Sequence, residues 1–424
     1  MNVVASMLIL LVTLALVLFR PRGLPAAFPA AVGGGLVLAL RLVSVHEAWD
    51  ILRLAQDALV FLIGMMLVSA IAERAGFFEW SATLAARAGK GSVLRLYLFI
   101  FLIGTLITVT LSLDATAIVL TPIVYAMALR LKLKPLPFMF ACGFIANTAS
   151  LFMPISNLTN LLIYRSLDFS FIRFSLIMFI PGLLAVVTNA ALFSYLFRRD
   201  LLGHYSRHAE PFQPANRAFF SLSIVGLATI LLAIFAASVV QIPIGVVALV
   251  GGIGLLTISR VRGWMPLTDA VRSVSWNLIV LVLGLFLVVE AVENAGLSGV
   301  FGHALHALAP GDSLLQLLGI AIGTTIGSNL INNIPMTIVA GTALRPALAA
   351  GTLHPAAGYA ALIGTNIGPN LTITGSLATL IWLSIVQAHG LSVTARQYLR
   401  LGILTMPLIL LSAILGLWLS LHIF

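Results

Sequence analysis

Long apolar runs, separated by short polar loops, recur along the whole chain. A run of about 20 apolar residues matches the roughly 30 Å hydrocarbon core of a bilayer. The pattern therefore predicts an all-α polytopic membrane protein with about ten transmembrane helices. The expected spans cover residues 2–19, 25–43, 57–73, 137–164, 172–197, 218–240, 243–259, 276–293, 357–385 and 401–423.

Two further apolar stretches, 94–130 and 313–349, are interrupted by polar residues near their middles. The first breaks at 112–114 and the second at 332–335. Backbone amides cannot stay unpaired in hydrocarbon, so a break at membrane depth is tolerated only where it lines a cavity or a bound solute. We expect each stretch to form a re-entrant hairpin that enters and leaves the membrane on the same side.

Composition and charge support this membrane architecture. The chain is 61% hydrophobic and 8% charged, whereas a soluble domain carries about 25% charged residues, so a soluble fold is excluded. The net charge of +10 does not indicate nucleic acid, because the basic residues lie in short loops, where they report orientation. All but five of the 23 Lys and Arg residues fall on one side of the expected topology. This predicts a multi-pass protein of the plasma (inner) membrane with both termini outside the cytoplasm. The five exceptions are Arg41, Arg53, Arg165, Arg173 and Arg345.

The two halves of the chain are related in sequence. Residues 57–76 align with 277–296 at an offset of 220, and at an offset of 219 Asp114 falls on Asn333. Each half has an odd number of spans, so the second copy must be inverted. Inverted repeats with broken helices at matching places are typical of secondary transporters. The expected repeats cover 1–207 and 208–424.

Asn, Ser, Thr, Pro and Gly cluster at both hairpin tips and within spans 137–164 and 357–385, which we expect to be broken. Half-helix N-termini there would add about half a positive charge each. Such a site suits a small polar solute or a partly dehydrated ion. Single Ser or Thr residues in membrane helices usually serve packing, so the argument rests on the clusters. The candidate substrate-binding residues are Ser112, Thr116, Asn147, Thr148, Ser150, Ser156, Asn157, Asn332, Asn333, Thr337, Asn366, Asn370, Thr372, Thr374 and Ser376.

Two acidic residues lie deep in apolar segments, where an Asp costs about 2.5–3.5 kcal/mol on insertion scales. Asp114 is at the first hairpin tip, and we expect it to be the group that couples transport to a proton or cation. The alternative is a structural acid satisfied by the amides of the tip. Glu290 is deep in another span and is either a second proton site or a buried partner for an arginine.

Other kinds of chemistry find no support in the sequence. The single cysteine, Cys142, provides neither a disulfide framework nor a thiolate cluster. Residues 88–92 lack the spacing of a phosphate-binding loop. We therefore expect no cofactor, no metal site and no enzymatic activity, and we expect an ion gradient to drive transport.

Three stretches carry a family resemblance: 113–124, 147–160 and 373–380. In them the chain resembles the arsenical-resistance membrane permeases, the ArsB-type arsenite/antimonite transporters of the ion transporter superfamily. The resemblance implies export of arsenite and antimonite in exchange for protons, with the hairpin tips and broken spans forming the site. In some relatives a cytoplasmic ATPase subunit is a partner. Other superfamily members carry a Ser-Asn-Thr tip for dicarboxylates with sodium, whereas 112–114 reads Ser-Leu-Asp, and the added acid disfavours carboxylates.

The sequence thus favours proton-coupled efflux by alternating access. The nearest alternative is a sodium/proton antiporter of the same superfamily, and a passive channel is a second. An alternative from a different functional class is an intramembrane enzyme that acts on lipid head groups. The expected partners are the inorganic solute, protons and membrane lipid, but not nucleic acid. The sequence allows a homodimer but does not specify one.

Overall fold

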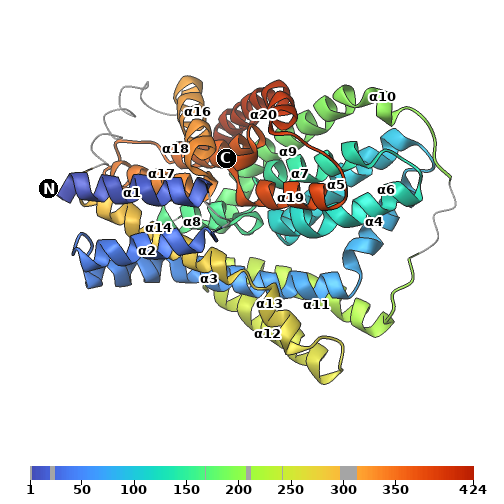
Figure 1. The fold of residues 1–424 in the computed structure, drawn as a ribbon, viewed down its shortest axis with the longest axis horizontal. Helices are drawn as coiled ribbons and strands as arrows, with labels where there is room; N and C mark the ends of the chain where they lie inside the picture. The colour runs from blue at the N-terminus through green and yellow to red at the C-terminus, as the bar shows by residue number, and fades with distance from the viewer. Residues whose placement is uncertain (1, 20–23, 168, 207–211, 241, 297–312) are drawn as a thin grey trace.

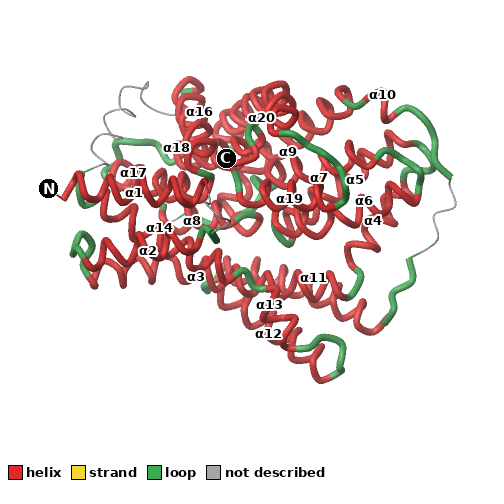
Figure 2. Tube along the Cα trace, in the orientation of Figure 1, coloured by secondary structure: helices red, strands yellow, loops and turns green. Residues whose placement is uncertain are grey.

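The computed structural model describes residues 2–19, 24–167, 169–206, 212–240, 242–296 and 313–424. All the named elements within these ranges are helical, joined by short loops (Figure 2). In this described part of the chain, eight segments are long and apolar enough to cross a membrane, which confirms the all-α polytopic prediction. These segments lie in α3 (Val45–Arg74), α5 (Val93–Thr110), α9 (Phe171–Leu196), α11 (Arg217–Val239), α12 (Ile244–Val261), α14 (Trp276–Glu293) with α13 (Leu267–Ser273) before it, α16 (Leu314–Ile331) and α20 (Ala395–Ile423).

Shorter helices complete the fold, and several of them belong to the expected hairpins and broken spans. They are α1 (Asn2–Phe19), α2 (Ala27–Ala39), α4 (Phe77–Ala88), α6 (Thr121–Arg130), α7 (Pro135–Ala149), α8 (Leu158–Ser166), α10 (Arg198–Leu201), α17 (Asn333–Ala349), α18 (Ala356–Ile367) and α19 (Leu377–Ala388). The sequence did not indicate α4, because its apolar side is short: Phe78, Ala82 and Ala85 are buried while Glu79 is exposed.

Both interrupted stretches break where their polar residues predict. In the first, α5 ends at Thr110 and the helix resumes at Leu113, continuing as a wide π-helical turn over Ala115–Leu120 that leads into α6. In the second, Asn332 alone separates α16 from α17, with a φ of 77°. The second interruption is therefore narrower than the expected 332–335, since Pro335 needs no amide donor in the first turn of α17 and fits there.

The spans expected to be broken are also interrupted. The first consists of α7, a short 3₁₀ turn at Pro154–Ser156 and α8. The second consists of α18, 3₁₀ turns at Gly368–Asn370 and Ile373–Gly375, and α19. Gly368 and Pro369 directly follow the end of α18, whereas α7 already ends at Ala149, before Pro154.

Glycines let two pairs of helices approach backbone to backbone. A Cβ at Gly64 of α3 would lie 2.4 Å from the carbonyl carbon of Ala248 in α12. A Cβ at Gly284 of α14 would lie 2.3 Å from the carbonyl oxygen of Ala30 in α2. Figure 1 shows α3 beside α12, with α11 and α13 along the same lower side, while α5, α7, α9, α19 and α20 gather in the upper right.

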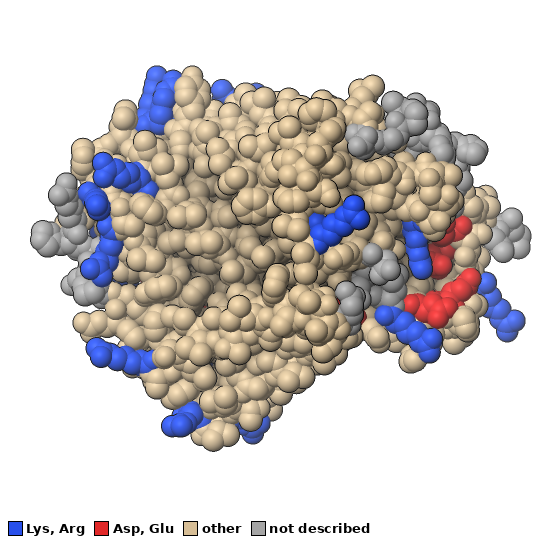
Figure 3. Space-filling model, turned by 180° about the vertical axis from the view of Figure 1, so that it is seen from behind, with Lys and Arg blue, Asp and Glu red and all other residues tan. Residues whose placement is uncertain are grey.

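Charged side chains lie mainly towards the two ends of the long axis, and a largely uncharged band lies between them (Figure 3). The acidic residues visible on that face lie near one end. This distribution fits a chain that crosses a bilayer. The expected boundary between the halves, at residues 207 and 208, lies outside the described residues.

Candidate functional site

The first hairpin tip places a carboxylate at the end of an interrupted helix. The Ser112 hydroxyl accepts a hydrogen bond from the Ala115 amide at 3.2 Å and so closes the turn. Asp114 is half-buried. Among the residues that the structure describes, no hydrogen bond or ion pair to its carboxylate is found within the usual distance limits. The tip's amides therefore do not satisfy this acid, so the purely structural reading of Asp114 loses its main support.

The π-helical turn after the tip is fixed by threonines. The Thr116 hydroxyl lies 2.8 Å from that of Thr108 and donates to the Gly104 carbonyl at 3.2 Å. Thr108 precedes the tip and Thr116 follows it, so the chain folds back on itself here. Thr116 is fully buried and positions the turn without facing a cavity.

The second hairpin tip is tied to the second broken span. Asn332 donates from Nδ2 to the Thr374 carbonyl at 3.1 Å and caps α17 by accepting from the Ile334 amide. Thr337 donates to the Asn333 carbonyl one turn earlier. Asn333 is buried and lies beside the cavity described below.

Two asparagines hold the broken spans together at their crossing. Asn366 of α18 accepts from Asn157 Nδ2 at 3.0 Å and from the Thr159 hydroxyl at 2.6 Å, and donates to Asn160 Oδ1. Asn147 of α7 donates to Asn370 Oδ1 at 3.0 Å and to the Thr379 hydroxyl at 3.3 Å. All of these side chains are buried.

The remaining candidates join this network or brace the breaks. Thr148 accepts from Asn370 and Asn189, while Ser150 donates to the Asn147 carbonyl. Thr372 donates to Asn329 Oδ1 at 2.6 Å and lies 3.2 Å from Thr374. The remaining two contacts are Ser156 to the Val109 carbonyl and Ser376 to Thr379.

A cavity of about 450 Å³ lies between the interrupted segments and the helices α2, α3 and α14; we call it the Asp114 cavity. Five of the expected site residues line it: Ser112, Asp114, Asn157, Asn333 and Ser376. The other candidate substrate-binding residues lie outside its lining and instead bond other polar side chains or backbone groups.

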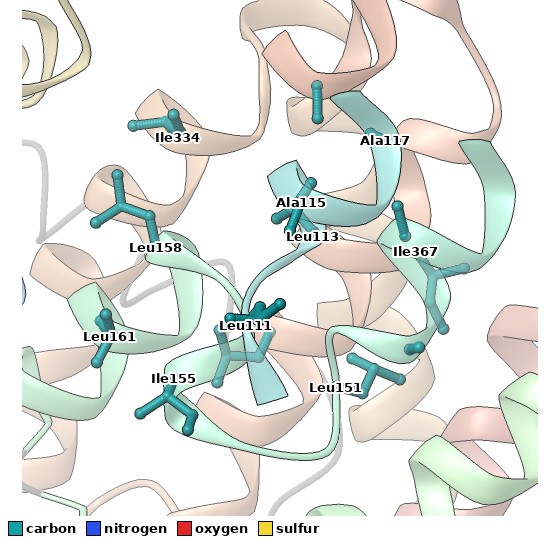
Figure 4. Packing of buried hydrophobic residues seen from close by; sticks show 14 of the residues in the cluster. Leu111, Leu113, Ala115, Ala117, Leu151, Ile155, Leu158, Leu161, Ile334 and Ile367 are labelled. Carbon is teal, nitrogen blue, oxygen red and sulfur yellow. The ribbon is translucent and has the colours of Figure 1, made fainter. Parts of the chain in front are cut away.

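Apolar residues form the rest of the wall around the first tip. Figure 4 shows Leu113 and Ala115 at the centre, with Leu158 and Ile334 on one side and Ile367 on the other. Of these, all but Ile367 line the cavity. The cavity is therefore a small polar patch within an apolar surround, and of the two acids in its lining, Asp114 and Glu73, Asp114 is the one at the tip.

Several lining residues carry no signal in the sequence. Met66, Ser69 and Ala70 on α3 and Ser275 and Asn277 at the start of α14 form the opposite wall. They sit in ordinary span sequence or at span ends, so only the packing of helices reveals them. Asn329, by contrast, is a polar residue near the end of an apolar span and could have been singled out.

Glu290 lies in a different place from Asp114. It lines a second cavity of about 530 Å³ with Glu47, Asp50, Arg53 and Arg345, which we call the Glu290 cavity. The two acidic candidates therefore do not share one site. Among the described residues, no cluster of His, Cys, Asp and Glu that could hold a metal ion is found.

Comparisons with known proteins agree along nearly the whole chain. A family model described as "Arsenical pump membrane protein" matches residues 5–421. An arsenical pump membrane protein of Escherichia coli (strain K12) is 31% identical over 410 residues, with 95% of each chain covered. A putative arsenical pump membrane protein of Bacillus subtilis (strain 168) is 26% identical over 428 residues, covering 95% of this chain and 96% of that one.

A solved structure shares the fold. The crystal structure of the Alcanivorax borkumensis YdaH transporter, described as having an unusual topology, superposes with a TM-score of 0.62 at 14% identity. The match covers 99% of this chain and 98% of that one. At this identity the likeness concerns the fold alone.

Proposed function

The chain belongs to the arsenical pump membrane protein family, and within that family we propose that it exports arsenite and antimonite in exchange for protons by alternating access. Membership makes it a multi-pass membrane transporter of arsenicals. The observation that carries the finer proposal is the unpaired Asp114 carboxylate, presented at a hairpin tip to a cavity that polar residues of all four interrupted segments also line.

The chemistry of the cavity suits arsenite. At neutral pH arsenite is an uncharged trihydroxide, which can both donate and accept hydrogen bonds. Ser112, Asn157, Asn333 and Ser376 offer hydroxyl and amide groups for these bonds. Tight capture of trivalent arsenic would need several thiolates, whereas the only cysteine, Cys142, is buried outside this cavity. Weak oxygen contacts allow the release that a transporter requires.

The charge pattern supports solute entry from the cytoplasm. The Asp114 cavity reaches exposed Glu73 at the end of α3, next to Arg74, which pairs with Asp269 at 2.8 Å. Arg74 belongs to the large group of basic residues that the positive-inside rule assigns to the cytoplasm. The cavity is then open to the cytoplasm, where solute enters, and both chain termini lie outside.

Paired contacts support two inverted repeats. Gly64 meets α12 as Gly284 meets α2, and the two glycines differ by the offset of 220 found in the sequence. In the proposed cycle, the hairpins and broken spans move as one body against α2, α3, α12 and α14. Proton and solute then compete for the first tip, so that loading one releases the other.

The test is Asp114→Asn, with Asp200→Asn as a control, since Asp200 pairs with Lys134 at 2.6 Å, distant from the cavity lining. We expect Asp114→Asn to reach the membrane folded but to lose arsenite resistance in cells and proton-linked arsenite exchange in vesicles, whereas the control retains both. Full transport by Asp114→Asn refutes the coupling role. A pH gradient dissipated by sodium, with no response to arsenite, refutes the substrate.

A further inference from the structure

The Glu290 cavity has no role in the function proposed above. Acidic and basic side chains line it together: Glu47, Asp50 and Arg53 on α3, Glu290 on α14 and Arg345 on α17. Ser166, at the end of α8, and Thr342 of α17 lie on its wall. The cavity is thus formed where α3 and α14 meet the interrupted segments α8 and α17, as the Asp114 cavity is.

The same helices line both cavities at different heights. On α14, Leu281 lines the Asp114 cavity and Phe286 the Glu290 cavity; on α17 the corresponding residues are Ile334 and Gly341. At 1.5 Å per residue these positions are about 7 and 10 Å apart along their helices. The cavities are therefore consecutive along one path.

A thin apolar layer separates them. Between the two linings, Leu285 of α14 is fully buried, as are Leu162 of α8 and Ile338 of α17. Apolar side chains exclude water and ions, so solute cannot pass from one cavity to the other while this layer is closed. Arg53 and Arg345 belong to the five basic residues that the positive-inside rule predicts outside, so this rule assigns the Glu290 cavity to the outer side.

Glu290 is the acid of the second cavity that lies within a membrane-spanning segment. The charged groups that face it are Glu293 on its own helix, Glu47 and Asp50 on α3, and the guanidinium groups of Arg53 and Arg345. Glu290 and Arg345 make no direct ion pair within 4 Å among the described contacts. Its carboxylate is consequently available to a proton that enters the cavity.

We propose that the Glu290 cavity is the outward half of the transport path and that Glu290 binds the proton there before it reaches Asp114. This rests on the proposed function. The proton moves from water in the cavity to a carboxylate oxygen of Glu290, and passes to Asp114 when the apolar layer opens. The acids thus serve the two sides of the membrane in turn, which explains why they lie in separate cavities.

The first experiment maps access with a membrane-impermeant maleimide on intact cells. Thr342→Cys reports the Glu290 cavity and Ser275→Cys the Asp114 cavity, while the buried Cys142 gives no background. We expect Thr342→Cys to be labelled from outside and Ser275→Cys only after the membrane is opened. Any other pattern of labelling overturns the assignment of the cavity to the outer side.

The second experiment separates proton coupling from solute transport in vesicles. Glu290→Gln is compared with Glu79→Gln, which removes the same charge from an exposed position on α4, outside the lining of both cavities. We expect Glu290→Gln alone to lose the acceleration of arsenite exchange by acid on the outer face, while arsenite counterflow without a pH gradient persists. An unchanged outer pH profile refutes the role of Glu290 and leaves the proposed function standing. If Glu290→Gln also loses arsenite counterflow, Glu290 stabilises the fold or binds the solute, and this outcome too refutes its role as the proton-binding residue.

Discussion

Replacing Asn366 by leucine removes a side chain that makes three hydrogen bonds at the crossing between the broken spans. Leucine has a similar branched shape but leaves the side-chain groups of Asn157, Thr159 and Asn160 without Asn366 as a hydrogen-bond partner. These groups are buried, so water cannot replace the lost hydrogen bonds. The substitution therefore tests how much the polar network stabilises the fold.

The magnitude follows from the number of bonds lost. Hydrogen bonds between membrane helices contribute about 0.6 kcal/mol each on average and about 1.7 at most, so three bonds amount to about 2–5 kcal/mol. Asn147, its mate at an offset of 219, donates two hydrogen bonds, and its buried Oδ1 has no hydrogen-bond partner among the residues that the structure describes. Removing that oxygen removes an existing cost, so we expect Asn147→Leu to lower stability by only about 0–2 kcal/mol.

The two variants are compared by thermal unfolding of the purified protein in detergent, without arsenite. We expect Asn366→Leu to lower the unfolding midpoint clearly more than Asn147→Leu, although the two positions match in sequence. An equal or larger decrease for Asn147→Leu would contradict this account, because it would mean that bond number does not set the stability of the crossing.

Two further perturbations test the helix packing and a helix cap. Gly64→Ala places a Cβ 2.4 Å from the backbone of Ala248 and should cost about 1–3 kcal/mol of stability, which lowers the yield of folded protein. In the control Gly254→Ala the new Cβ meets no atom within 4 Å, so the yield should be unchanged. Equal yields of the two variants refute the tight contact at Gly64. Ser44 caps α3 and, by its backbone and side-chain hydrogen bonds, lowers the pKa of Glu47. The stability that the ionised Glu47 carboxylate contributes is present above the ordinary pKa of a glutamate, and it is lost as the pH falls through the lowered pKa of Glu47. Ser44→Ala should therefore lower the stability by about 1 kcal/mol at neutral pH, and the variant should lose less stability than the unchanged protein when the pH falls. Thermal unfolding midpoints measured at several pH values test this. An unchanged midpoint at neutral pH contradicts the role of Ser44 as a cap.

The interruptions were predictable because polar residues inside long apolar runs have few physical explanations. The sequence therefore located the interruptions in both apolar stretches and in both broken spans to within a few residues. It missed α4, whose apolar side is too short to stand out, and it made the second interruption too wide. A proline in a first helical turn looks like a break in sequence, although the helix tolerates it there.

The sequence predicted where the site lies better than it predicted which residues line it. A buried asparagine signals a polar partner, but sequence does not distinguish a solute from another amide. Asn366 and Asn370 thus qualify as binding residues by position, yet the structure pairs them with the opposite broken span. The wall formed by α3 and α14 was missed for the converse reason, since residues such as Ala70 become part of a site only through packing.

The pairing of the broken spans bears on how such a protein could move. Asn147 bonds Thr379, and Asn366 bonds Asn160; at an offset of 219 each pair is the counterpart of the other. Hydrogen bonds are directional and resist relative displacement of the two spans. The layer between the cavities is apolar, and hydrophobic contacts have no direction, so sliding there breaks no specific bond. We therefore expect the crossing to stay rigid while the apolar layer opens, which places the moving boundary between the interrupted segments and α3 and α14.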